Sequence, residues 1–103
     1  MSRQAKGGVK ERVVEKTRIK EPRLWKVLFL NDDVTPFTYV IKVMMETFDK
    51  GREEAEILTC KIHNEGIGVV GIYPKSIAEA KKMQADAKSK TYDYPLTIKL
   101  ERE

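Results

Sequence analysis

The pattern of hydrophobic and polar positions divides residues 24–103 into six segments. The first, residues 24–30, is an almost unbroken apolar run rich in β-prone side chains, so we expect a buried strand. Asn31, Asp32 and Asp33 follow it. Their short polar side chains bond to nearby backbone and oppose both helix and strand, which predicts a loop.

An amphipathic helix is predicted next, beginning at Thr35-Pro36 and stopping at Gly51. Threonine is a frequent N-cap, and proline suits the first helical position. Large apolar side chains then recur at the three- and four-residue spacing of a helix with one buried face. These are Phe37, Val40, Ile41, Met44 and Phe48.

A second helix is predicted over residues 52–63. Glu53 and Glu54 lie in its first turn, where the helix dipole favours negative charge. Gly66 lies just past its end, where a helix commonly terminates on glycine. Its buried stripe is expected to contain Ala55, Leu58 and Ile62.

The remaining pattern predicts strand, helix and strand. Residues 67–73 form a strand closed by Pro74, which we expect to be continuous, bent or split in two. Residues 75–89 form a helix that buries Ile77, Ala80, Met83 and Ala87, and residues 96–100 form a strand with Leu96, Ile98 and Leu100 on one face. The order β-α-α-β-α-β predicts an α+β fold, in which a small antiparallel sheet packs against three helices.

Charge is distributed unevenly along the chain. Of the net charge of +4, residues 1–23 contribute +5 (eight Lys/Arg against three Glu), and the remainder contributes −1. Few large apolar residues accompany this basic stretch, so we expect a flexible basic tail over residues 1–22 and one folded domain over residues 23–103. A basic tail also leaves open a ribosome-associated or nucleic-acid-binding module as the alternative function.

Composition also bears on the compartment. The longest apolar run is far too short to span a bilayer, and the N-terminus lacks the apolar stretch of a signal peptide. The single cysteine, Cys60, has no internal disulfide partner, and we expect it to pack as a small hydrophobe. These features predict a cytoplasmic protein without a membrane partner.

Candidate chemistry gathers at Asn31, Asp32, Asp33 and His63. Turn formation and capping explain one aspartate but do not need both, and a lone histidine at a helix end is commonly a surface or cap residue. A metal site built from Asp32, Asp33 and His63 lacks the usual ligand spacing. A catalytic site lacks an evident nucleophile. From the residues alone, these four side chains could therefore form a binding site, cap structural elements, hold a metal ion or act in catalysis.

Several spaced motifs resemble the ClpS family. The longest is the segment Lys26-Val27-Leu28-Phe29-Leu30-Asn31-Asp32-Asp33-Val34-Thr35-Pro36, in which a strand, an Asn-Asp-Asp loop and a Thr-Pro helix start follow one another. Shorter matches are Ile62-His63-x-x-Gly66, Gly71, Ala78-Glu79-Ala80-Lys81 and Pro95-Leu96. The resemblance runs from about Leu24 to the C-terminus and leaves only the tail outside.

The resemblance implies an adaptor, not an enzyme, without cofactor or metal. Such adaptors bind proteins that begin with Leu, Phe, Tyr or Trp and deliver them to a ClpA-type AAA+ unfoldase that works with ClpP. Nucleic acid is not implied as a partner, and we expect a monomer. The implied contacts to the substrate's α-amino group come from Asn31, Asp32, Asp33, Thr35 and His63. The implied hydrophobic pocket contains Leu30, Phe37, Val40, Thr59, Ile62 and Leu96, and the unfoldase would contact Glu79 and Lys81.

Two of these pocket positions depart from the family pattern. Phe37 and Thr59 stand where methionine is common in the family. Phenylalanine is stiffer than methionine, and threonine is smaller and more polar. The preference among Leu, Phe, Tyr and Trp therefore stays open.

Overall fold

The computed structural model describes residues 23–103, so the predicted tail over residues 1–22 lies outside the described residues. The α+β prediction and the order of elements are confirmed. The elements are β1 (Leu24–Leu30), α3 (Phe37–Thr47), α4 (Arg52–Glu65), β2 (Ile67–Pro74), α5 (Lys75–Thr91) and β3 (Thr97–Arg102).

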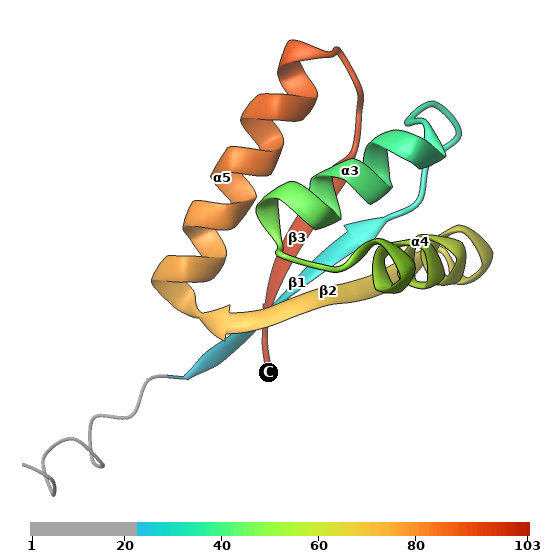
Figure 1. Ribbon diagram of the computed structural model, residues 1–103. Coiled ribbons are helices and arrows are strands. Elements are labelled where there is room, and N and C mark those ends of the chain that lie inside the picture. The colour runs from blue at the N-terminus through green and yellow to red at the C-terminus, as the bar shows by residue number, and fades with distance from the viewer. Residues whose placement is uncertain (1–22) are drawn as a thin grey trace, which may run out of the picture.

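The sheet has the strand order β2-β1-β3, with both neighbours antiparallel to the central strand β1. All three helices lie on one face of it, with α3 between α4 and α5 (Figure 1). Side chains from this face form the core, and the largest fully buried side chain is Phe29. The last strand begins at Thr97, one residue later than predicted; of the three residues predicted for its inward face, Leu96 and Ile98 are buried and Leu100 is partly buried.

The second strand is continuous, so the prediction that it could be split in two is wrong. Its register against β1 slips at one point: Val27 pairs with Gly71, but Leu28 pairs with Val69. Val70 is therefore an extra residue on β2, a β-bulge of the kind that bends a strand without ending it. Val70 is only 1% exposed, so the bulge directs its side chain into the core.

The first helix begins and ends differently from the prediction. Pro36 is the N-cap, in an extended conformation with ψ 143°, so the helix begins at Phe37, and Thr35 is not the cap. At the other end, α3 stops at Thr47, and Asp49 takes the left-handed conformation (φ 56°) expected of glycine. Aspartate tolerates this region better than most residues. Gly51 is instead the N-cap of α4.

The second helix runs two residues further than predicted and ends at Gly66 as expected. Gly66 has φ 89°, and its N–H donates to the Ile62 carbonyl oxygen. The prediction for Cys60 is wrong, because its side chain is exposed. The buried stripe of α4 runs along Ala55, Thr59 and Ile62, and Cys60 lies outside it.

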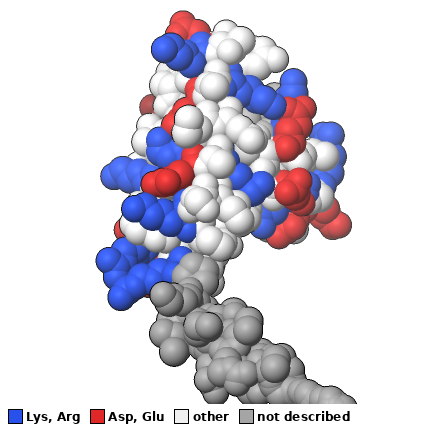
Figure 2. All heavy atoms as spheres, turned by 90° about the vertical axis from the view of Figure 1, so that its left-hand side faces the viewer, with Lys and Arg blue, Asp and Glu red and all other residues white. Residues whose placement is uncertain are grey.

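The predicted buried face of the third helix is also wrong. Ile77 is 45% and Met83 is 71% exposed. The buried residues of α5 are the small Ala78, Ala85 and Ser89. Small side chains let the helix approach the sheet closely. Figure 2, which faces this side of the molecule, shows an uncharged band between charged side chains.

Candidate functional site

The loop after β1 is tied to the C-terminal end of α4. The backbone N–H of Asn31 donates to the Gly66 carbonyl oxygen at 2.9 Å. This bond joins two segments that lie far apart in the sequence, so the Asn31–Asp33 loop and the last turns of α4 become neighbours. His63 is on those last turns.

Asp32 shapes this loop. One of its carboxylate oxygens accepts bonds from the N–H groups of Val34 (2.8 Å) and Thr35 (2.7 Å), and the other accepts from the Thr35 hydroxyl at 2.8 Å. Partial burial of the carboxylate opposes its ionisation, but these three bonds favour the charged form and hold the pKa of Asp32 below its ordinary value. Asp32 therefore fixes the backbone of the turn, and Thr35 uses its hydroxyl there instead of capping α3.

The acceptors at the edge of this loop face solvent. Asn31, Asp33 and His63 are all exposed. The His63 ring also lies edge-on to the ring of Phe37, with 6.2 Å between the ring centroids and 78° between the ring planes. An amide, a carboxylate and an imidazole therefore gather around one opening, with an aromatic ring beside them.

A cavity of about 230 Å³ opens between these groups. Its lining contains every residue that the sequence assigned to the amino-group contacts and to the hydrophobic pocket, so the structure brings the two sets together. It also contains Phe29, which was not among the predicted pocket residues and which precedes Leu30 in the buried run of β1. The full lining is Phe29, Leu30, Asn31, Asp32, Asp33, Thr35, Phe37, Val40, Thr59, Ile62, His63 and Leu96.

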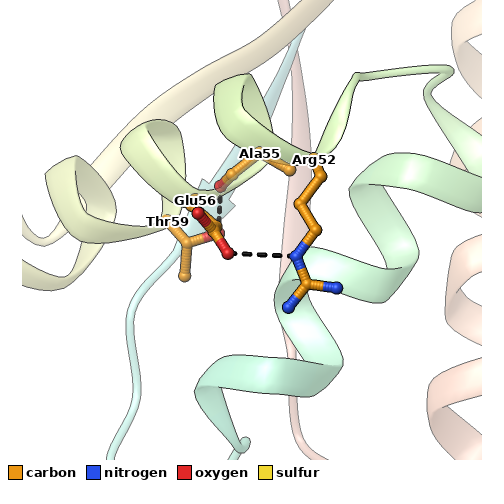
Figure 3. A network of polar contacts seen from close by, with 4 residues as sticks. All are labelled: Arg52, Ala55, Glu56 and Thr59. Carbon is orange, nitrogen blue, oxygen red and sulfur yellow. Dashed lines mark hydrogen bonds and ion pairs between the residues drawn. The ribbon is translucent and has the colours of Figure 1, made fainter.

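Thr59 contributes a small side chain to this lining, and its hydroxyl is hydrogen-bonded within its own helix. It is 3% exposed, and its hydroxyl donates to the Ala55 carbonyl oxygen one turn earlier at 2.7 Å. Figure 3 shows the hydroxyl turning back along α4, while the methyl group points away from that carbonyl. The nearby ion pair between Arg52 and Glu56 (3.0 Å) involves exposed side chains and is not part of the cavity lining.

Neither residue predicted to contact an unfoldase lines this cavity. Glu79 is exposed on α5. The Lys81 ammonium donates to the Thr47 carbonyl oxygen at 2.8 Å, lies 3.6 Å from a carboxylate oxygen of Asp49, and sits over the rings of Phe48 and Tyr73. Lys81 thus holds α5 against the C-terminal end of α3.

Two features of residues 23–103 bear on the alternatives. They contain no group of three or more His, Cys, Asp or Glu side chains arranged to hold a metal ion. Over the same residues, no helix has the length and apolar character needed to cross a membrane.

Comparison with known proteins supplies the family. The family described as "ATP-dependent Clp protease adaptor protein ClpS" matches residues 20–99. The ClpS adapter of Deinococcus radiodurans is 42% identical over 90 residues, covering 87% of this chain and 80% of its own. The adapter of Helicobacter hepaticus is 45% identical over 82 residues, covering 80% and 83%.

A solved structure agrees with the sequence comparison. Agrobacterium tumefaciens ClpS2 bound to L-phenylalaninamide superposes with a TM-score of 0.77 at 32% identity, over 81% of this chain and 100% of that one. The chain therefore belongs to the ClpS family, whose members are adaptors of the ATP-dependent Clp protease and not enzymes.

Proposed function

We propose that this adaptor binds the free amino terminus of proteins that begin with Leu, Phe, Tyr or Trp, and delivers them to a ClpA-type AAA+ unfoldase paired with ClpP. The observation that carries the proposal is that one cavity has exposed acceptors at its mouth and apolar side chains on its walls. Such a cavity matches a chain end that is charged on the backbone and apolar in its first side chain.

The polar mouth suits an ammonium group. A free α-ammonium offers three donors and a positive charge, and it needs acceptors. Asn31, Asp33 and His63 offer an amide oxygen, a carboxylate and an imidazole nitrogen, and bonds to a charged donor are roughly twice as strong as neutral ones. In this proposal Asp32 and Thr35 act mainly by holding the loop in shape, and Asp32 adds negative charge.

The apolar walls suit a large first side chain. Burial of a Leu or Phe side chain is worth about 1.5–3 kcal/mol, which separates large from small first residues by one to two decades in affinity. The phenylalaninamide bound to the Agrobacterium relative has both features, a free amine and a benzyl side chain. We propose the same class of ligand for the present chain.

The test is a binding titration with a peptide that begins with phenylalanine, compared with the same peptide acetylated at its amino group. The free peptide should bind. Acetylation removes the charge and two donors, so it should weaken binding at least tenfold, as should Asp33→Ala or His63→Ala. Asn64→Ala, at the exposed position next to His63, is the matched control and should bind normally. Equal binding of the free and acetylated peptides would refute the proposal.

We propose that the unfoldase contacts α5 at Glu79 and Lys81, and the exposed Glu79 is the residue to test first. Glu79→Ala changes an exposed side chain and should weaken capture of the unfoldase's N-terminal domain without weakening peptide binding. Lys81→Ala also removes the bond to Thr47, so its effect on capture needs correction for lost stability. We place the protein in the cytoplasm, as a monomer, where its exposed Cys60 stays reduced.

A further inference from the structure

The cavity is large for an aliphatic side chain. A buried apolar cavity of roughly 150 Å³ is enough to hold benzene. The present cavity is about 230 Å³, and part of that space is the polar mouth. A phenyl or indole ring can therefore fill the apolar part, whereas the four side-chain carbons of leucine leave some of it empty.

Thr59 is a short side chain on the α4 wall of this cavity. It is only 3% exposed, and its hydroxyl donates to the Ala55 carbonyl oxygen within α4. A longer unbranched side chain at this position would reach past the threonine methyl group into the space that a ring would occupy. The residue at position 59 thus sets how much of the cavity is available.

Phe37 adds a second, independent preference for a ring. It is 41% exposed, lines the cavity and already stands edge-on to His63. Aromatic pairs in edge-to-face or offset geometry gain more than their buried area alone provides. A ring entering the cavity can make such a contact with Phe37, and a leucine side chain cannot.

We infer that this site prefers an aromatic first residue to leucine, and that Thr59 and Phe37 determine this preference. The inference rests on the proposed function, because it concerns the same site. Phenylalanine buries three more side-chain carbons than leucine. If about half of that gain is realised, the affinity for a Phe peptide exceeds that for a Leu peptide by about tenfold.

The experiment is a set of binding titrations with peptides that differ only in their first residue, Phe or Leu, each free and acetylated. Thr59→Met fills the cavity, so the Phe-to-Leu affinity ratio should fall to roughly threefold or less while Leu binding is kept. Thr59→Val has the same shape without the hydroxyl and is the matched control, which should keep the tenfold ratio. Phe37→Leu removes the aromatic ring at the cavity and should lower the Phe-to-Leu ratio independently. This variant therefore tests the inference even if Thr59→Met binds neither peptide.

The outcomes separate the two proposals. If neither free peptide binds, or acetylation has no effect, the proposed function fails and this inference fails with it. If both free peptides bind equally well to the wild-type protein, the proposed function stands and the inference is overturned. The inference is also overturned if the Phe-to-Leu affinity ratio is unchanged both in Phe37→Leu and in a Thr59→Met variant that still binds the Leu peptide. Loss of the ratio in Thr59→Val overturns it as well.

Discussion

Replacement of Lys81 should weaken the fold without touching the cavity. Its ammonium donates to the Thr47 carbonyl oxygen at the C-terminal end of α3, and its side chain is only 20% exposed. The last carbonyls of a helix have no partner within the helix, and they carry the negative end of the helix dipole. A cation at this point therefore satisfies an otherwise unpaired acceptor.

Lys81→Met keeps most of the stem and removes the charge. A hydrogen bond to a charged group contributes about 1.5–3 kcal/mol, and the helix dipole adds up to about 1 kcal/mol. The Asp49 pair adds little, because that carboxylate is 85% exposed. We therefore expect the free energy of unfolding to fall by about 2 kcal/mol.

Urea denaturation measures this loss directly. With an m-value of about 1 kcal/mol/M for a small domain, the midpoint should fall by about 2 M. Lys82→Met is the matched control, since Lys82 makes only a surface pair with Asp86 one turn along α5 and should shift stability by less than about 0.5 kcal/mol. Equal shifts for the two variants would show that the Thr47 bond contributes no more than a surface ion pair.

Three further predictions concern the loop, a helix end and the thiol. Folding lowers the pKa of Asp32, so its contribution to stability is present above about pH 4 and is lost as the pH falls further. The difference in unfolding free energy between wild type and Asp32→Asn, measured by urea denaturation, should therefore narrow between pH 6 and pH 3. Gly66→Ala places a side chain at φ 89° and should cost about 1 kcal/mol, whereas Gly51→Ala at φ −71° should cost less than about 0.5 kcal/mol by the same assay. Cys60 should react with a thiol reagent as fast in the folded protein as in urea, and slow reaction in the folded state would contradict its exposure.

Local pattern was sufficient for most of the fold. The apolar run of β1, the spacing along α3 and the glycine after α4 each specify an element through short-range physics, and all three are present. The face of α5 was not predictable in the same way. Its buried residues are Ala78, Ala85 and Ser89, and hydropathy ranks these below Ile77 and Met83. Close packing selected small size over hydrophobicity.

The loop showed the limits of local rules more sharply. Thr35-Pro36 reads as a helix start, but Asp32 takes the Thr35 hydroxyl for its own turn, so the helix begins one residue past the proline. The proximity of His63 to the loop has no local signal at all. It depends on the bond between Asn31 and Gly66, which forms only when the chain between them has folded.

The cavity is built from three separate segments of the chain, which matters for chains that are incomplete. Its walls come from the end of β1 with the start of α3, from α4, and from Leu96 just before β3. Because Leu96 and β3, which pairs with β1, come last in the sequence, a chain still emerging from synthesis, or one cleaved before Leu96, lacks one wall of the cavity. A ligand that contacts all three walls should also raise the melting temperature of the whole domain, because it binds only the folded state.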